Sequence, residues 1–306
     1  MFILDIIDKG ILIDLAQNCR ASYEGLARKY GITATAIKKR ITSLEVDGVI
    51  TGFFVELSLA MIDAELVLTL VRTDDSYNDD EFTEASRENP SIYAILPLST
   101  GDIVVLAESV RLEGLSELGT FIRSLKGIKS AEVHPLLVER GRKAELTPIQ
   151  LRVLASLVED ARMTVPEIAR KTGLNARRTR RILKELTEGE SIRFTITRNM
   201  NVGESMAILT QISWNPSELD RNELDRILRE MYPLEYWFAL ASAIEPTVFG
   251  QFVVEHIKDV ERILGELKKI DGVTRVITHL FFPGKIFPSL SRGTLEDMVA
   301  DIELIP

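Results

Sequence analysis

Cysteine, long apolar runs and an export signal are scarce or missing in this sequence of 306 residues. The one cysteine, Cys19, excludes an intrachain disulfide framework and fits a reducing compartment. The apolar runs are short and interrupted, so the sequence predicts no membrane span. Residues 1–5 lack the basic start and apolar stretch of a secretory signal. We therefore expect a cytoplasmic protein that does not bind membranes.

Sequence motifs of catalysis and metal binding are absent as well. There is no P-loop, no Rossmann glycine pattern, no Gly-x-Ser-x-Gly and no His-Glu-x-x-His. Two of the three histidines, His134 and His279, match each other in the repeat described below and could bind a metal or a haem-like ligand together. No further ligand lies at the usual spacing, which favours a structural role for both. Cys19 could sense oxidants, but a lone cysteine just after a helix is more often inert. We predict no catalytic residue, no metal and no cofactor, and hence a protein that is not an enzyme.

The negative charge of the chain is unevenly distributed. The net charge is −9 in an ordinary globular composition, with 45% hydrophobic and 27% charged residues. Residues 143–200 hold 12 Lys and Arg against 7 Asp and Glu, and residues 1–55 hold 7 against 6. These segments carry +5 and +1, so the rest of the chain carries −15. Local basic charge on an otherwise acidic protein is typical of a surface that faces phosphates.

An internal repeat organises the chain. The segment Leu26–Ala34 reappears as Ile168–Ala176, at an offset of 142 residues. The match resumes as Leu125–Ile128 against Ile270–Val273 at an offset of 145, which also places His134 on His279. Two matches that keep nearly one register over this distance indicate a tandem duplication.

The first part of each copy predicts three helices followed by a β wing. Helices are expected over residues 8–17 and 23–30, the second ended by Gly31 in a left-handed C′ position. Thr33 caps a third helix that buries Ile37, Ile41 and Leu44, and Asn175 has the same capping position in the second copy. Residues 53–55 and 192–197 read as the strands that follow.

The later part of each copy alternates strand and helix in the order β-α-β-β-α-β, which predicts a ferredoxin-like α+β domain. Residues 139–145 are polar, lack apolar periodicity and are expected to be a linker, whereas residues 289–306 form either a capping helix or a loosely held end. The predicted domains are a winged helix-turn-helix at 1–57, a ferredoxin-like domain at 62–139, a second winged helix-turn-helix at 144–200, a second ferredoxin-like domain at 204–284 and a tail at 285–306.

The two third helices carry the strongest functional signal. Opposite the buried stripe of the first lie polar and basic residues, and the second presents a basic face. The predicted DNA-binding residues are Thr35, Lys38, Lys39 and Thr42 in the first helix and Arg177, Arg178, Arg180, Arg181 and Lys184 in the second. Between Arg170 and Lys184 there are seven basic residues and no acidic one, so the ion pairs of an ordinary solvated helix are expected to be missing. Such a helix suits the major groove of double-stranded DNA.

Three segments resemble the Lrp/AsnC family of feast/famine transcription regulators: Asp5–Leu12, Arg20–Tyr23 and Ile41–Ile50. The resemblance implies a winged helix-turn-helix followed by a βαββαβ regulation domain that binds amino acids or other small effectors. The second copy departs from the pattern, since Asp47-Gly48-Val49 becomes Gly189-Glu190-Ser191 and Ile37 becomes Thr179. The family normally assembles from single copies, so a fused chain is expected to form an intrachain pseudodimer, with a homodimer as a further possibility.

The resemblance also implies an effector site near the turn between the middle strands of the regulation domain. The matching residues are Ser99, Thr100, Gly101 and Asp102. Their counterpart, residues 243–247, keeps neither the glycine nor the aspartate. The alternative is that Gly101 and Asp102 simply form a hairpin turn, which both residues favour.

Together these features predict a sequence-specific DNA-binding transcription regulator that a small effector, such as an amino acid, could modulate. One alternative is a tetrapyrrole enzyme, because siroheme decarboxylases resemble the same two-domain plan. The three histidines and the concentration of basic residues on one helix favour DNA over that reading. Another alternative is a protein-interaction module whose DNA binding has decayed, which the weakly charged first helix leaves open.

Overall fold

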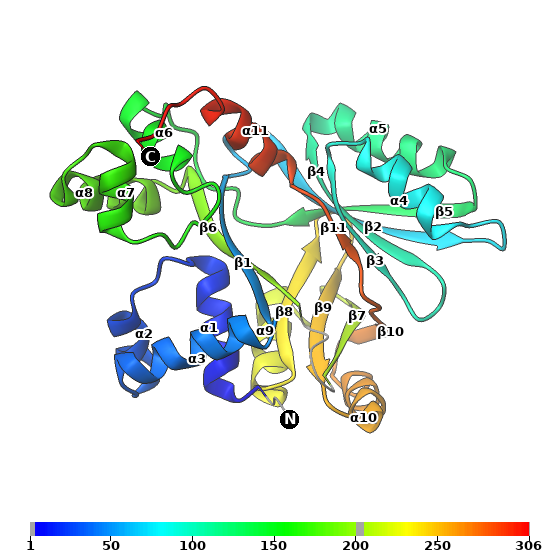
Figure 1. Ribbon diagram of the computed structural model, residues 1–306. Helices are drawn as coiled ribbons and strands as arrows, with labels where there is room; N and C mark the ends of the chain where they lie inside the picture. Colours follow the sequence, from blue (N-terminus) through cyan, green and yellow to red (C-terminus); the bar gives the residue numbers. More distant parts are fainter. Residues whose placement is uncertain (1–3, 200–204, 306) are drawn as a thin grey trace. The chain divides into compact units, whose positions relative to one another are not determined.

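The computed structural model describes residues 4–199 and 205–305 and divides into two compact units (Figure 1). The helical unit lies within residues 2–63, 140–199 and 291–306, and the sheet unit lies within residues 64–139 and 200–290. Each copy of the repeat therefore contributes its first part to the helical unit and its later part to the sheet unit. No helix of the described residues is long and apolar enough to cross a membrane.

The helical unit contains two similar three-helix domains. The first comprises α1 (Ile6–Gln17), α2 (Tyr23–Tyr30) and α3 (Ala34–Val46), and the second comprises α6 (Pro148–Ala155), α7 (Val165–Thr172) and α8 (Ala176–Glu188). The predicted caps are present: Thr33 accepts a hydrogen bond from the Ala36 amide at 3.1 Å, and Asn175 accepts one from the Arg178 amide at 2.9 Å. Gly31 ends α2 at φ 67°, the left-handed conformation that glycine adopts most easily.

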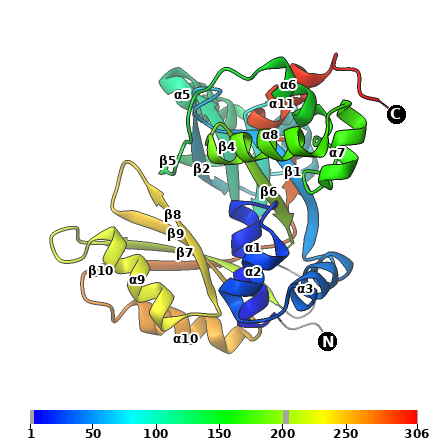
Figure 2. The ribbon, with the colours of Figure 1, turned by 90° about the vertical axis from the view of Figure 1, so that its left-hand side faces the viewer.

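One strand follows each third helix, and the two strands pair with each other. β1 (Ile50–Leu57) runs antiparallel to β6 (Ile192–Arg198). The strand expected after each third helix is present in both copies, and each strand pairs with that of the other copy. A lone strand leaves its backbone groups unpaired, and the other copy supplies the partner. The two three-helix domains lie at opposite ends of this ribbon (Figures 1 and 2).

The sheet unit contains two βαββαβ domains, which confirms the predicted α+β class with ferredoxin-like domains. The first copy supplies β2 (Ala64–Thr73), α4 (Asp79–Arg87), β3 (Ile92–Pro97), β4 (Ile103–Val110), α5 (Arg111–Ser124) and β5 (Ile128–Leu137). The second supplies β7 (Met206–Trp214), α9 (Arg221–Met231), β8 (Tyr236–Ser242), β9 (Thr247–Val254), α10 (Ile257–Leu267) and β10 (Val273–Leu280). Both sets have the same spatial order, β5-β2-β4-β3 and β10-β7-β9-β8.

The two sheets share an apolar core and join at both ends. One face of each sheet packs against its own helices, and the other face contributes to a common cluster that includes Leu68, Val104, Leu209 and Phe249. The copies join where β5 pairs with β8 and where the Leu98–Phe281 bridge brings the ends of β3 and β10 together. These joins are equivalent in the repeat, so the two βαββαβ domains are related by a pseudo-twofold arrangement.

The C-terminal segment contributes to both units. β11 (Lys285–Ile286) extends the first sheet by pairing with β3, and α11 (Leu290–Val299) follows it. The buried side chains of Leu295 and Val299 anchor α11, and the Ile305 amide donates a 2.8 Å hydrogen bond to the Lys171 carbonyl at the end of α7. Of the two expectations for residues 289–306, the capping helix is therefore the one observed.

Candidate nucleic-acid interface

The basic residues predicted on the second recognition helix share an exposed surface of α8. Its buried side comprises Thr179, Ile182, Leu183 and Leu186, which fix the helix on α6 and α7. All five predicted DNA-binding side chains on this helix are exposed: Arg177, Arg178, Arg180, Arg181 and Lys184. Because the buried residues recur at helical spacing, five of the 13 residues of α8 are exposed cations.

The expectation that these cations lack acidic partners was wrong for two of them. Arg181 Nε lies 3.3 Å from Glu185 Oε1, and Lys184 Nζ lies 3.7 Å from Glu188 Oε1. Glu185 and Glu188 follow the basic run, one helical turn after their partners, so the run itself contains no negative charge. Exposed pairs of this kind are worth little and exchange readily with phosphate partners. Among the described residues, Arg177, Arg178 and Arg180 have no acidic partner within 4.0 Å.

The third helix of the first copy, α3, has fewer exposed cations than α8. Thr35, Lys38, Lys39 and Thr42 are all exposed on α3, as predicted from the position of its apolar stripe. Its third cation, Arg40, is directed to α1 instead, where Nη1 lies 2.8 Å from Asp5 Oδ2 and 2.7 Å from Asp8 Oδ1. Arg40 therefore stabilises the three-helix domain, and two lysines remain for a nucleic-acid surface.

The predicted effector turn contacts both copies of the sheet unit. Gly101 has φ 85°, and Thr73 donates hydrogen bonds to the Gly101 carbonyl at 2.9 Å and to Asp102 Oδ1 at 3.3 Å. Ser99 exchanges backbone and side-chain hydrogen bonds with Leu280 of β10 at 3.0 and 3.2 Å. The bonds from Thr73 stabilise the hairpin turn within the first copy, and the bonds of Ser99 attach the turn to the second copy.

The two matched histidines lie beside these turns, a relationship that the sequence interpretation missed. His134 Nδ1 lies 3.2 Å from Ser242 Oγ and 3.5 Å from Glu245 Oε1, next to the turn of the second copy. His279 lies near Asp102 in the turn of the first copy, and its Nδ1 is buried without a hydrogen-bond partner. Burial lowers the pKa of both imidazoles, against the opposing effect of the nearby carboxylates. The sequence indicated this relationship, because His134 and His279 occupy the same position in the two copies of the repeat.

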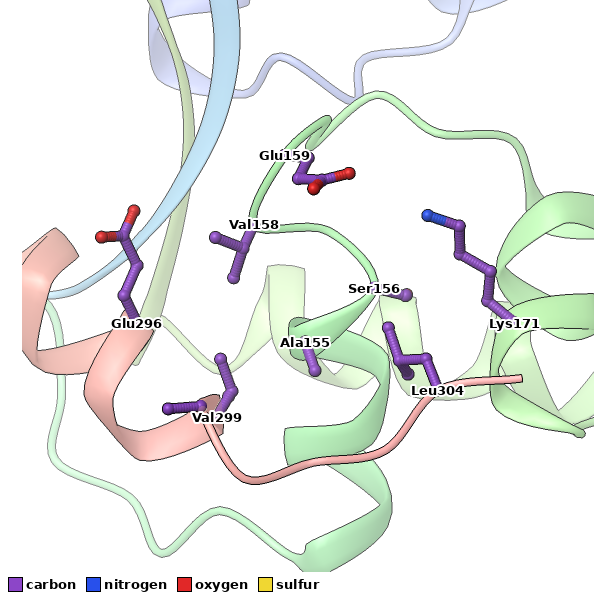
Figure 3. Close-up of a pocket in the computed structure, with 9 residues that line it drawn as sticks. Ala155, Ser156, Val158, Glu159, Lys171, Glu296, Val299 and Leu304 are labelled. Atoms are coloured by element: carbon purple, nitrogen blue, oxygen red, sulfur yellow. The ribbon is translucent and has the colours of Figure 1, made fainter. Parts of the chain in front are cut away.

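A pocket of about 280 Å³ lies between the second three-helix domain and the C-terminal segment. Its lining comprises Ala155, Ser156, Val158, Glu159, Lys171, Glu296, Val299, Ala300 and Leu304. Figure 3 shows Lys171 and Glu159 extending toward each other at one side, with the apolar side chains of Val158 and Val299 nearby. In the described part of the chain, no group of three or more His, Cys, Asp or Glu side chains could hold a metal ion.

Comparisons with known proteins agree with this division into repeats. A family model of winged helix-turn-helix DNA-binding domains matches residues 4–51 and 146–193. The leucine-responsive regulatory protein of Haemophilus influenzae is 30% identical over 146 residues, which is 44% of this chain and 85% of that protein. The uncharacterized HTH-type transcriptional regulator PH0045 of Pyrococcus horikoshii is 42% identical over 72 residues, and this match covers 21% of the chain and only 46% of that protein.

A solved structure has a similar fold over nearly the whole length of the chain. The siroheme decarboxylase NirDL is 12% identical, and the match covers 97% of this chain and 99% of that one with a TM-score of 0.53. Identity at this level establishes the shared fold alone. The relationship to the leucine-responsive regulator covers most of that protein at higher identity. The chain therefore belongs to the Lrp/AsnC family and carries the family's helix-turn-helix and regulation domain twice.

Proposed function

We propose that this protein is a sequence-specific regulator of transcription that binds double-stranded DNA, with α8 as its main recognition helix. The observation that carries the proposal is the exposed basic surface of α8, where three of the five cations have no acidic partner within 4.0 Å among the described residues. The match of both copies to DNA-binding winged helix-turn-helix domains supports it.

The two recognition helices would read DNA in different ways. An arginine such as Arg177 can donate two parallel hydrogen bonds to O6 and N7 of guanine, while neighbouring cations neutralise phosphates. Lys38 and Lys39 of α3 act as point charges suited to phosphates, and Thr35 and Thr42 add short hydroxyl donors. We therefore expect an asymmetric operator, with the stronger base preference in the half bound by α8.

The test is a DNA-binding titration followed by fluorescence anisotropy across a series of salt concentrations. The DNA is the protein's own upstream region, with random-sequence duplex as the competitor. Arg177→Ala/Arg181→Ala should lower affinity at least about tenfold and reduce the salt slope by about one to two units. Lys38→Ala/Lys39→Ala should cost less, and Lys268→Ala/Lys269→Ala, which removes two exposed charges from the sheet unit, should cost least.

Two results would contradict this proposal. One is a wild-type protein that binds its upstream DNA no better than random duplex. The other is an Arg177→Ala/Arg181→Ala variant that binds like the Lys268→Ala/Lys269→Ala control. Either result would favour an interaction module whose DNA binding has decayed.

We also propose that a small effector, such as an amino acid, binds at Ser99, Thr100, Gly101 and Asp102. The buried, unpaired Nδ1 of His279 beside this turn supports a polar ligand there. Isothermal titration with a panel of amino acids tests the proposal, and Asp102→Asn should weaken binding of any ligand found. Binding that is unchanged in Asp102→Asn would place the ligand elsewhere.

A tetrapyrrole enzyme is the second candidate, because the fold of NirDL matches nearly the whole chain. The histidines give it little support: His134 is only 4% exposed and its Nδ1 contacts Ser242. Titration with an iron porphyrin, followed by Soret absorbance, tests this candidate directly. Stoichiometric binding that is lost in His279→Ala would favour the enzyme over the regulator.

A further inference from the structure

We propose that Arg20 and Arg162 form a reciprocal clamp that fixes the separation and rotation of the two recognition helices, so that the chain reads two half-sites at one spacing. The two arginines occupy the same position in the repeat, 142 residues apart. They are positioning residues and lie outside the exposed basic surface of α8. The proposal rests on the proposed function for its biological meaning, but its geometry can be tested without DNA.

Each arginine reaches from one copy to backbone carbonyls of the other. Arg20 Nη1 donates to the Ala161 carbonyl at 2.5 Å, and Nη2 donates to the Met163 carbonyl at 3.0 Å. In return, Arg162 Nη1 donates to the Cys19 carbonyl. The planar guanidinium presents its donors in a fixed fork, so two bonds from one group restrict rotation as well as distance.

The surroundings of Arg162 tighten the contact further. Its guanidinium lies 4.8 Å from the ring centroid of Tyr23 and 5.5 Å from that of Phe53, both in the first copy. Cys19 and Ala161, the aligned residues next to the clamp, are both fully buried. Charge-assisted hydrogen bonds and cation–π contacts are stronger where water is excluded.

Backbone contacts repeat the same reciprocity. The Cys19 amide donates to the Phe194 carbonyl of β6 at 2.9 Å, and the aligned Ala161 amide donates to the Phe53 carbonyl of β1 at 3.2 Å. The hydroxyl of Thr195 adds a 2.8 Å bond to the Ala16 carbonyl at the end of α1. Each copy is thus attached to the strand of the other at the start of its helix-turn-helix.

These attachments supply the resistance to twisting that the β1–β6 ribbon lacks by itself. A two-stranded ribbon is only marginally stable and twists easily, so by itself it would leave the helices at its ends free to rotate. The clamp lies beside the ribbon and ties the loop after each first helix. Each three-helix domain also has its own buried residues, such as Ile41 and Ile182, so loss of the clamp should loosen their relative position without unfolding either domain.

The direct test measures the distance between spin labels on α3 and α8 in the full chain. Labels go on the aligned, exposed positions through Thr42→Cys and Lys184→Cys. The parent and every variant also carry Cys19→Ala, because Cys19 is buried beside the clamp and loosening the clamp would expose its thiol to the label. We expect a narrow distance distribution in the parent and a clearly broader one in Arg20→Met/Arg162→Met. Arg123→Met/Arg221→Met removes two exposed arginines of the sheet unit as the control and should leave the distribution narrow.

An equally narrow distribution in Arg20→Met/Arg162→Met would overturn the proposal, provided that circular dichroism shows a folded variant. If this variant unfolds, Arg20→Lys/Arg162→Lys replaces it, since lysine keeps the charge but lacks the fork. Broadening in that variant supports the clamp, and an unchanged width overturns it.

A DNA experiment separates the clamp from the proposed function. Both half-sites are placed on one duplex, and the separation of their centres is varied through one helical turn, about 10.5 base pairs. The parent in this experiment is the wild-type chain, because Thr42 and Lys184 belong to the proposed DNA-binding surface, and it should bind best at one separation. Arg20→Met/Arg162→Met should lose at least about fivefold in affinity there, an energy of about 1 kcal/mol, and bind a single half-site within about twofold of the parent. A variant that keeps the parent's spacing profile, or loses single-site affinity equally, overturns the clamp. A parent without sequence-selective binding contradicts the proposed function and leaves the spin-label result standing.

Discussion

The third helices of the two copies, α3 and α8, each have 13 residues and differ in their surfaces. The buried stripe Ile37, Ile41 and Leu44 of α3 corresponds to Thr179, Leu183 and Leu186 of α8, and all six are buried. The exposed positions have diverged from two lysines to four arginines and a lysine. Packing thus constrains one side of each helix, while the exposed side is free to change its charge.

The contacts between the first and second helices of each domain also differ between the copies. In the first copy, Tyr30 donates a 2.8 Å hydrogen bond to Asp14 and its ring lies over Gly10. The aligned residues of the second copy are Thr172, Ser156 and Arg152. There the two hydroxyls bond to carbonyls of their own helices, at 2.6 Å in both cases. A polar contact between helices in one copy is thus replaced by local bonds in the other.

Truncation of a buried side chain in the third helix should give the largest difference in stability cost between the two copies. Ile37→Ala removes a fully buried side chain and should destabilise the first domain by about 2–4 kcal/mol. The aligned Thr179→Ala removes a smaller group and one 3.1 Å hydrogen bond to the Asn175 carbonyl, and should cost about 1 kcal/mol. Hydrogen exchange resolved by mass spectrometry measures both effects in peptides that cover α1–α3 and α6–α8. Equal costs in the two copies would show that Thr179 is as important to packing as Ile37.

Gly10 should be the next most sensitive position, because a Cβ there would lie 2.5 Å from the Tyr30 ring. Gly10→Ala should cost about 1–2 kcal/mol despite the better helix propensity of alanine, since the ring must move. Arg152→Ala, at the aligned exposed position, should be close to neutral. The same exchange measurement applies, and Tyr30→Leu should recover part of the loss. A Gly10→Ala variant as stable as wild type would mean that the ring moves freely.

The two histidines should make the stability of the sheet unit sensitive to acid. Burial lowers the pKa of His134 and His279 in the folded state, whereas an unfolded chain has an ordinary histidine pKa of about 6.5. As the pH falls through that value, the unfolded state gains protons that the folded state does not bind, so the free energy of unfolding decreases. Glu245 and Glu132 oppose the shift at His134, and Asp102 opposes it at His279.

Denaturant titrations between about pH 7.5 and 5.5 should show this decrease, and His134→Gln should make it smaller, because one of the two groups that gain a proton on unfolding is removed. The comparison uses the slope with pH, because the substitution also removes the contact with Ser242. The same slope in His134→Gln and wild type would assign the acid sensitivity to other groups.

The smallest effect is expected at Cys19, whose aligned residue is Ala161. Cys19→Ala makes the copies alike at a fully buried position and should change stability by no more than about 1 kcal/mol. Burial raises the pKa of the Cys19 thiol to about 12, so the folded protein should resist iodoacetamide near neutral pH. Mass spectrometry of the treated protein gives the readout. Rapid alkylation of the native chain would show that the junction between the copies opens often.

Local features were the most predictable part of this fold. Tyr23–Tyr30 has the bounds expected from its apolar pattern and Gly31, and Thr33 and Asn175 cap their helices as predicted. These depend on neighbours within one helical turn, which the sequence displays directly. The pairing of β1 with β6 was not predicted, because alternation shows that a strand has a buried face and says nothing of its partner.

The candidate site shows the same limit. Exposure of the basic residues followed from helix periodicity, but the pairs with Glu185 and Glu188 lay one turn beyond the segment considered. The roles of Arg20 and Arg162 had a visible signal, since identical residues occur at the repeat offset. What they bind could not be inferred, because backbone carbonyls of another domain leave no mark on residue type. Contact of these surfaces with DNA remains a prediction.

The pairing of β1 with β6 has a consequence for mass action. Both strands belong to one polypeptide, so the fraction of chains in which they are paired does not depend on the total concentration of the protein. Two separate subunits joined by the same strands would come apart on dilution, and their DNA-binding form would grow with the square of monomer abundance. Fusion replaces that steep response with a linear one. A cell that makes a few copies of this chain would have the same proportion of chains with paired β1 and β6 as a cell that makes thousands.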